Sequence, residues 1–375
     1  MPPSPPPSGA AAPATPGTGS AWFTARLARG AALAPMAGFT DAPFRRLCRH
    51  YGAAWAVTEM VSAKGLAQGG GGVEIAEPYP GEPDVVIQLF AADPDLAAAA
   101  VARLETTYRP AAFDLNMGCP VKKVVNKGCG SELLRDPERA AAVVAAMVAA
   151  TGRPVSAKLR LGIDRFVAIE VAHAVVEAGA VALAVHGRTA VQRYEGEADW
   201  DRIAEVAAAV GVPVLGSGDV NDAPGYAAAR RRGLGVMIAR GSLGRPWVFA
   251  EVRGAQSPDP HEVALVAWRH VQDHVAWYGG EHALRRLRGQ LGHYAVAAGG
   301  ARVGEFRDAL VRVERVGDVA VAFARFVGID PRDPPAETSP ALRALVAAPP
   351  LRRDGGHEVP RRTAPADMVG ALNGG

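Results

Sequence analysis

Short apolar runs alternate with longer amphipathic or alanine-rich stretches through roughly the first two thirds of the chain. Apolar runs of this length, separated by helical patterns, are typical of parallel strands that are buried on both faces. We therefore predict eight strands, at residues 31–37, 53–60, 84–90, 112–118, 154–162, 180–188, 213–220 and 235–241.

The stretches between these strands carry helix start and stop signals. Asp93-Pro94 and Asp136-Pro137 each place a capping side chain before a proline at the first helical position. The segment 164–179 ends in a glycine stop. The connection 61–83 contains four consecutive glycines and several prolines, so we expect mostly loop there.

Eight such strands predict an α/β protein with a closed (β/α)8 barrel, the TIM barrel. A doubly wound open sheet is the alternative, but its usual glycine fingerprint is absent after the first strand, where the turn reads PMAGFTDAPF. After residue 255 the strand pattern stops and three or four helices are expected, two of them ending in Gly-Gly. The predicted division is a disordered Pro/Ala-rich segment 1–22, a barrel 23–255, a small helical domain 256–330 and a disordered tail 331–375.

Composition narrows the class of protein. Hydrophobic residues make up 49% of the chain and the formal net charge is +3, which permits a polyanionic partner. Three cysteines without a C-x-x-C pair argue against a disulfide framework or a zinc site, and they suit a reducing cytoplasm. We expect no signal peptide, no membrane span and no metal.

Polar residues stand at the carboxyl end of nearly every predicted strand, where parallel barrels carry their active sites. The last two strands end in the glycine-bearing turns 216–219 and 239–241, a place where barrels commonly bind phosphate. Arg240 can add a bidentate contact. Lys158 and His186 would face the middle of the mouth, and a positive group near the N1–C2 edge of a flavin stabilises its reduced form. This combination suggests flavin mononucleotide (FMN).

The loop after the fourth strand is long, from Cys119 to Arg135, and it opens with Cys119-Pro120. Long loops in compact domains are often functional. Cys48 and Cys129 are interpreted as structural, and His173 and His270, on helical faces, as structural or solvated.

The sequence resembles the tRNA-dihydrouridine synthases, a family of FMN-dependent bacterial-type enzymes. The matching segments are LAPMAGFTDAPFRRLCRHYGA, TEMVSAKGL, IQLF, FDLNMGCPVKKVVNKGCGSELL, KLRLG, VHGRT, GSGDV and GVMIARGSLGRPWVF, in the correct order between Leu33 and Phe249. The helical tail is similar to the RNA-binding domain of the family.

The resemblance implies a specific reaction and a specific site. NADPH would reduce the flavin, and hydride would pass to C6 of a uridine in the D-arm of tRNA while Cys119 protonates C5. The flavin contacts of the family carry over to Pro35, Met36, Ala37, Gln88, Lys158, His186, Ser217, Gly218, Asp219, Ala239 and Arg240. Substrate contacts are expected from Asn116, Arg160, Arg188 and Arg288, and a monomer is expected.

The chain departs from the family pattern in three places. Ser217 stands where the family usually has Asn, Ala239 replaces the first glycine of the strand-eight turn, and the usual Met-Arg-Lys-His run is Leu-Arg-Gly-Gln at 287–290. The stretch 281–315 has seven Arg against four acidic residues, which is consistent with RNA contact or with an ordinary solvated face.

Two other functions remain open from the residues. A flavin barrel that reduces a free pyrimidine or another small molecule shares the thiol and the barrel, but it needs no basic helical appendage. A non-catalytic RNA-binding scaffold is the third possibility, and Cys119, Lys158 and His186 argue against it.

Overall fold

The computed structural model describes residues 16–69, 72–334 and 338–353. The strands of this part of the chain form a single parallel sheet. Their bounds are β1 (Ala32–Leu33), β2 (Ala56–Val57), β3 (Val61–Ser62), β4 (Val85–Phe90), β5 (Ala112–Met117), β6 (Val155–Arg160), β7 (Leu183–His186), β8 (Val214–Ser217) and β9 (Gly235–Ile238).

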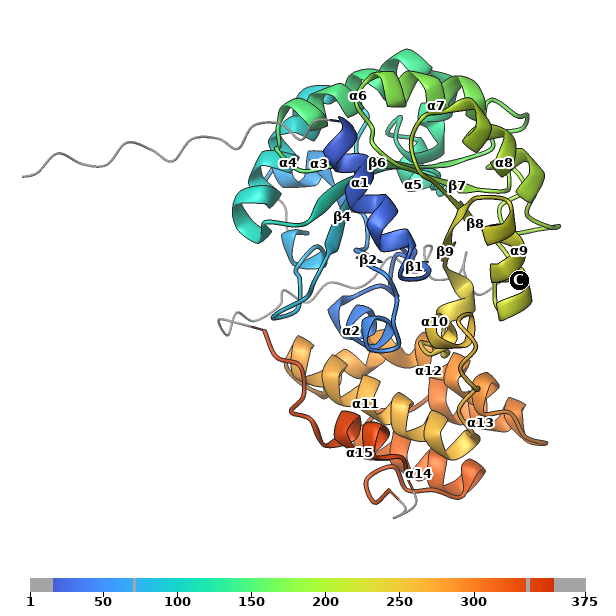
Figure 1. Ribbon diagram of the computed structural model, residues 1–375. Helices are drawn as coiled ribbons and strands as arrows, with labels where there is room; N and C mark the ends of the chain where they lie inside the picture. Colours follow the sequence, from blue (N-terminus) through green and yellow to red (C-terminus); the bar gives the residue numbers. More distant parts are fainter. Residues whose placement is uncertain (1–15, 70–71, 335–337, 354–375) are drawn as a thin grey trace, which may run out of the picture.

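The sheet closes on itself because β1 pairs with both β2 and β9, and β2 pairs in turn with β4. The remaining strands pair in chain order from β4 to β9. Since β2 and β3 both pair with β4, they occupy one position, and the barrel has eight positions. The predicted (β/α)8 barrel is confirmed, and the open sheet is excluded (Figure 1).

The second predicted strand, 53–60, forms β2 only as far as Val57, and β3 begins beyond it at Val61, after a break that starts at Thr58. The Gln88 N–H donates to Thr58 Oγ1 at 3.2 Å, and the hydroxyl donates to the Glu59 carbonyl at 2.9 Å. On β4, the Gln88 N–H therefore bonds a threonine hydroxyl where a regular strand pair would offer a backbone carbonyl. The regular pairing with β4 is interrupted here, between β2 and β3. Glu59 lies in this break, and its carboxylate accepts a 2.6 Å hydrogen bond from the Gly38 N–H. Glu59 therefore orients the loop after β1.

Helices cover the outside of the barrel and continue beyond it. Those of the barrel region are α1 (Pro16–Leu27), α2 (Ala42–His50), α3 (Ala63–Ala67), α4 (Pro94–Tyr108), α5 (Lys122–Val125), α6 (Pro137–Ala149), α7 (Ala168–Glu177), α8 (Trp200–Ala209), α9 (Ala223–Arg231) and α10 (Val248–Glu251). Those that follow are α11 (Pro260–Tyr278), α12 (Leu284–Ala298), α13 (Val303–Val311), α14 (Val316–Val327) and α15 (Pro340–Ala347).

The predicted helix signals have the expected geometry. Asp93 and Asp136 accept hydrogen bonds from the third backbone N–H of α4 and α6, each with proline at the start of the helix. The helix expected at 164–179 is shorter, since α7 begins at Ala168 after a loop in which the Val167 N–H bonds the Leu161 carbonyl. In its described residues, the connection 61–83 contains the two-residue strand β3, the short helix α3 and a 3-10 turn, Val73–Ile75, and is otherwise loop.

The predicted disordered segment 1–22 is wrong for residues 16–22, which belong to α1; residues 1–15 lie outside the described residues. Helix α1 covers the end of the barrel where the strands begin. Phe23 is 2% exposed and packs edge-on against Trp55, with ring centroids 5.7 Å apart. Ser20 donates to the carbonyl of Val181, which precedes β7. The apolar pair Trp22-Phe23 anchors a helix whose first residues read as low-complexity sequence.

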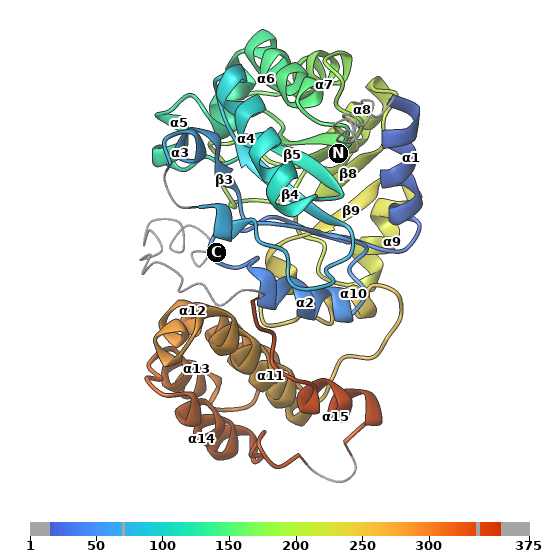
Figure 2. The same ribbon diagram turned by 90° about the vertical axis from the view of Figure 1, so that its left-hand side faces the viewer.

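The helices α11 to α14 pack around a second apolar core beside the barrel (Figures 1 and 2). The expected Gly-Gly ends are present, because α11 stops at Gly279 in the left-handed conformation and α12 stops at Gly299. Trp268, Trp277 and Tyr294 are buried in these helices, as a packing role requires.

The predicted disordered tail 331–375 is wrong for residues 340–347, which form α15; residues 335–337 and 354–375 lie outside the described residues. The buried guanidinium of Arg269 pairs with Asp273 at 2.6 Å and donates to the Leu345 and Pro349 carbonyls at 3.0 and 2.7 Å. Leu342 and Leu345 are buried in the helical core. An internal Arg–Asp pair therefore fastens a segment that composition alone assigns to disorder.

Within the described residues, no helix has the length and apolar character needed to cross a membrane.

Replacing Phe23 by alanine should lower the free energy of unfolding by about 3 to 5 kcal/mol, because a buried ring is lost and leaves a cavity under the barrel. Thermal or denaturant unfolding measures the change. Val191, which is 68% exposed, offers the control V191A, for which we expect a change within about 0.5 kcal/mol. A loss for F23A no larger than that of the control would show that α1 does not pack on the barrel.

Candidate functional site

A cavity of about 790 Å³ opens at the end of the barrel where the strands finish. Most of the predicted site residues line it, and they come from β1, β4, β5, β6, β7, β8 and β9 or from the residues directly after them. The predicted residues in the lining are Pro35, Met36, Ala37, Gln88, Asn116, Cys119, Lys158, Arg160, His186, Ser217, Gly218, Asp219, Ala239 and Arg240.

Buried polar side chains form a continuous hydrogen-bonded chain below this cavity. Ser156 donates to one oxygen of Asp114 at 2.7 Å, and the amide of Gln88 donates to the other at 2.7 Å. The Asn116 amide donates in turn to the Gln88 carbonyl oxygen at 2.8 Å. Burial raises the pKa of Asp114 above its ordinary value. Asp114 was not among the predicted residues, although it lies two positions before Asn116 on the same strand.

Asn116 connects this chain to the backbone of the cysteine loop. Its side-chain oxygen accepts hydrogen bonds from the Gly118 N–H at 3.2 Å and from the Cys119 N–H at 3.0 Å. The loop is closed on its other side by the Ser131 N–H, which bonds the Cys119 carbonyl at 3.0 Å. Gly130 makes that closure possible, because its φ is +62° and a Cβ there would lie 2.6 Å from the same carbonyl oxygen. The thiol is therefore presented from a backbone held on both sides.

The environment of Cys119 favours a thiol over a thiolate. Burial raises its pKa above the ordinary value, and the opposing influences of the Val121 amide, Arg160 and Lys158 do not cancel that effect. A thiol that keeps its proton at neutral pH can act as a general acid. The other two cysteines, Cys48 and Cys129, are buried.

Lys158 and His186 lie on neighbouring strands, as predicted. Burial lowers the pKa of Lys158 to about 8, with a further contribution from Arg160. Burial also lowers the pKa of His186 well below its ordinary value, and the neighbouring cations Arg160 and Lys158 add to the effect. The His186 Nε2 lies 3.3 Å from the Arg188 guanidinium, which can only donate. His186 is therefore neutral, with its proton on Nδ1.

The turns after β8 and β9 form one wall of the cavity. Gly218 has a φ of +124°, and a Cβ there would lie 2.5 Å from the Ala198 side chain, so the turn requires glycine. The Ser242 N–H and hydroxyl both donate to the Ala239 carbonyl, at 2.9 and 2.8 Å, and hold the second turn. Asp219 lies between two arginines, 2.7 Å from Arg188 and 3.7 Å from Arg240.

Two of the predicted substrate contacts lie elsewhere. Arg188 is 2% exposed and does not line the cavity; it donates to the carbonyls of Glu195 and Gly196 and to Asp219. Arg288 lies on α12, where its Nε donates to the Val313 carbonyl at 2.8 Å. Arg160 lines the cavity, but its guanidinium also donates to the carbonyls of Gly118, Thr189 and Arg193.

The structure adds lining residues that the sequence did not indicate. Tyr194 lies beneath the guanidinium groups of Arg240 and Arg160, with 4.6 and 5.5 Å between each central carbon and the ring centroid. His293 reaches the cavity from α12, so the helical region contributes to the site. Seven basic side chains and one acidic one line the cavity: Lys122, Lys123, Lys158, Arg160, Arg193, Arg240, Arg245 and Asp219. A strongly positive lining favours an anionic ligand.

The chain is similar in sequence to several curated proteins of one family. The chain is 38% identical over 295 residues to tRNA-dihydrouridine synthase B of Pseudomonas aeruginosa, covering 75% of this chain and 88% of that protein. It is 40% identical over 277 residues to the synthase B of Xanthomonas campestris, covering 70% and 82%, and 36% identical over 294 residues to a probable tRNA-dihydrouridine synthase of Rhizobium leguminosarum, covering 76% and 88%.

The conserved profile of the family called dihydrouridine synthase (Dus) matches residues 32–324, which include the barrel strands and the helices α11 to α13 in full. Among solved structures, the BexX/CysO complex of Amycolatopsis orientalis overlaps at 18% identity and a TM-score of 0.41, covering 60% of this chain and 87% of that one. On the match to the family profile and the identity to its curated members, the chain belongs to the dihydrouridine synthase family.

Proposed function

We propose that the protein reduces the C5–C6 double bond of a uridine in the D-arm of tRNA to 5,6-dihydrouridine, with FMN as cofactor and NADPH as reductant. The observation that carries the proposal is the position of Cys119 in the lining of a positively charged cavity that also contains Lys158 and His186, where burial raises the pKa of the thiol. The relatives named above are tRNA-dihydrouridine synthases, which supports tRNA as the substrate.

The residues of the cavity fit an FMN. Its volume of about 790 Å³ lies within the range of cofactor pockets. Pro35, Met36 and Ala37 supply an apolar wall, and the turns 217–219 and 239–241 with Arg240 supply the place for a phosphate. Lys158 would hold the edge of the ring that becomes negative on reduction. Ser217 and Ala239 depart from the family pattern, but both still line the cavity. Both positions can therefore still contribute to binding the cofactor.

FMN, when bound, supplies the hydride that adds to C6 of the uracil ring. The chain itself supplies the proton that completes the addition, from Cys119 Sγ to C5. Asn116 fixes the loop that carries the thiol, since it accepts the N–H of Cys119 while its amide is anchored on Gln88. Arg160 ties the same loop to the loop after β7 through the Gly118 and Thr189 carbonyls. These contacts support the proposed role of Cys119, because they hold the backbone that carries the thiol.

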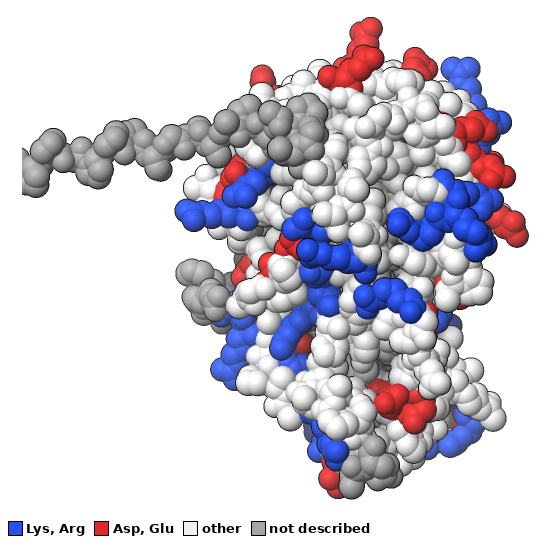
Figure 3. Space-filling view, in the orientation of Figure 1, with Lys and Arg blue, Asp and Glu red and all other residues white. Residues whose placement is uncertain are grey.

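The entrance to the cavity has the charge that an RNA backbone requires. Lys122, Lys123 and Arg193 are exposed and line the opening, together with the half-buried Arg245. The opposite face, over which α1 lies, carries Lys and Arg side chains across its middle with Asp and Glu among them (Figure 3). Asp84 pairs with Arg26, and Arg29 and Arg49 lie 3.7 and 3.9 Å from the same carboxylate. The proposed tRNA surface is therefore the cavity side, where His293 brings α12 to the opening.

The reaction is tested by incubating purified protein with FMN, NADPH and unmodified tRNA, then measuring dihydrouridine by mass spectrometry of the nucleosides. C119A should keep its flavin and its oxidation of NADPH but lose dihydrouridine formation by about 100-fold or more, since general acids contribute on this scale. C129A, in the same loop but buried away from the lining, is the matched control and should retain activity.

Normal product yield from C119A would remove the thiol from the mechanism. A yellow native protein that oxidises NADPH without tRNA and never forms dihydrouridine would instead favour the reduction of a small molecule.

The reduction of bound flavin by NADPH should weaken as pH rises through about 8. The Lys158 ammonium predominates below its lowered pKa of about 8 and is lost above it, so the stabilising positive charge disappears on the alkaline side. K158R keeps a charge to well above pH 10, because the guanidinium pKa exceeds about 12. We expect the native rate to fall across this range and the variant rate to stay level. The loss of flavin absorbance in a stopped-flow instrument measures the reduction rates of the native protein and of K158R, at matched flavin content. If the two rates depend on pH in the same way, Lys158 is not the titrating group.

A further inference from the structure

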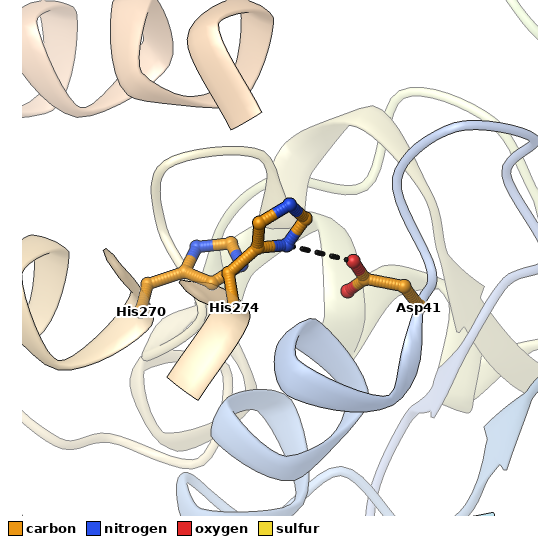
Figure 4. Close-up of side chains that lie close together, drawn as sticks. All are labelled: Asp41, His270 and His274. Atoms are coloured by element: carbon orange, nitrogen blue, oxygen red, sulfur yellow. Dashed lines mark ion pairs between the residues drawn. The ribbon is translucent and has the colours of Figure 1, made fainter. Parts of the chain in front are cut away.

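Three buried side chains meet where the helical region packs on the barrel, away from the cavity. Asp41 begins α2, and His270 and His274 lie one turn apart on α11. Figure 4 shows the three groups converging from the two parts of the chain. A carboxylate oxygen and one nitrogen from each imidazole all lie within 4.8 Å of one another, and none of the three residues lines the cavity.

One of the two ring nitrogens of His274, Nδ1, is buried and has no hydrogen-bond partner of standard geometry among the described residues. Its Nε2 lies 3.1 Å from the Ala283 carbonyl, which can only accept, so Nε2 carries a proton. Its Nδ1 is 3.0 Å from Asp41 Oδ2, an ion-pair distance, and among the described residues Nδ1 has no hydrogen-bond partner of standard geometry. In the neutral ring with its proton on Nε2, the Nδ1 lone pair faces a carboxylate oxygen, and a cation bound by both atoms stabilises that arrangement.

His270 is arranged in the same way. Its Nδ1 lies 3.1 Å from the Tyr294 hydroxyl, while its Nε2 is buried and has no hydrogen-bond partner within the described part of the chain. Buried polar atoms are ordinarily paired, because an unpaired one costs about 1 to 3 kcal/mol. In metal sites, by contrast, one imidazole nitrogen faces the ion and the other bonds a protein group that fixes the ring. Tyr294 and Ala283 are in the positions of such second partners.

We propose that Asp41, His270 and His274 form a binding site for one divalent transition metal ion, of the Zn²⁺ type. Two imidazoles and one carboxylate are a set of ligands typical of zinc. Ligand atoms of a tetrahedral zinc site lie about 3.3 Å apart, so the widest pair here must approach by up to about 1.5 Å on binding. The fourth position would take water.

The ion would act as a clamp between the two parts of the chain. Asp41 follows the loop of residues 34–40, whose Pro35, Met36 and Ala37 form a wall of the cavity. The histidines lie on α11, the longest helix of the helical region. Metal binding would therefore fix the helical region to a loop of the active site. The cysteine count predicted no metal, but cysteines take no part here, and the site joins residues more than 220 positions apart.

The test uses the untagged full-length chain. The protein is loaded with Zn²⁺ or Co²⁺, dialysed, and analysed for metal by mass spectrometry and for the visible absorption of tetrahedral Co²⁺. We expect about one equivalent of metal and a melting temperature that falls when a strong chelator removes it. The double variant H270N/H274N should lose the metal and the effect of the chelator. H261N, which alters an exposed histidine on the same helix, should retain both.

The Co²⁺ spectrum of the native protein keeps the test decisive if the double variant fails to fold. A native protein that holds less than about a tenth of an equivalent, shows no Co²⁺ absorption and melts at an unchanged temperature with chelator would overturn the proposal. Asp41 and His274 would then contact each other directly, with no ion between them. Dihydrouridine formation does not enter either readout, so this result is independent of the proposed reaction.

Discussion

The pairing of β1 with β9 closes the barrel, and the arrangement of the cavity depends on that closure. Ala32 and Leu33 align with Met237 and Ile238, which brings the loop after the first strand beside the turn after the last. Parallel strands of matching direction then finish at one rim, so residues from seven strands reach a single cavity. An open sheet would separate the wall formed by Pro35 and Met36 from the turn that contains Arg240.

Within that frame, buried hydrogen bonds set the position of the reactive loop. The chain from Ser156 through Asp114 and Gln88 to Asn116 runs across three neighbouring strands and ends on the backbone of Cys119. A satisfied polar network in a low-dielectric interior is rigid, because each lost bond leaves a buried group unpaired. The lowered pKa of Lys158 and the neutral state of His186 arise from the same burial. The rigidity of the loop and the electrostatics of the site therefore have one origin.

The helical region belongs to the site as well as to the surface. His293 of α12 lines the cavity, Arg46 of α2 pairs with Asp273 of α11 at 3.1 Å, and α15 is fastened by Arg269. These contacts connect the expected RNA-binding helices to the loop after β1. The proposed metal site lies in this same junction, where Asp41 meets the two histidines of α11.

The sequence by itself determined the eight strands, the capped helices and nearly all of the residues at the strand ends. Apolar periodicity, proline and glycine signals and the position after a strand are local properties, and they read directly from neighbouring residues. It also determined the family, through motifs such as that around Cys119.

Only the tertiary structure decided which polar groups form hydrogen bonds with each other and which distant side chains pack together. Arg188 was expected near the substrate, but its donors are taken by Asp219 and the Glu195 and Gly196 carbonyls. Helices α1 and α15 lie in segments of low-complexity composition, and distant partners such as Trp55 and Arg269 stabilise them. The meeting of Asp41 with His270 and His274 likewise has no local signal. Packing between residues far apart in the chain, which no short pattern encodes, produces each of these features.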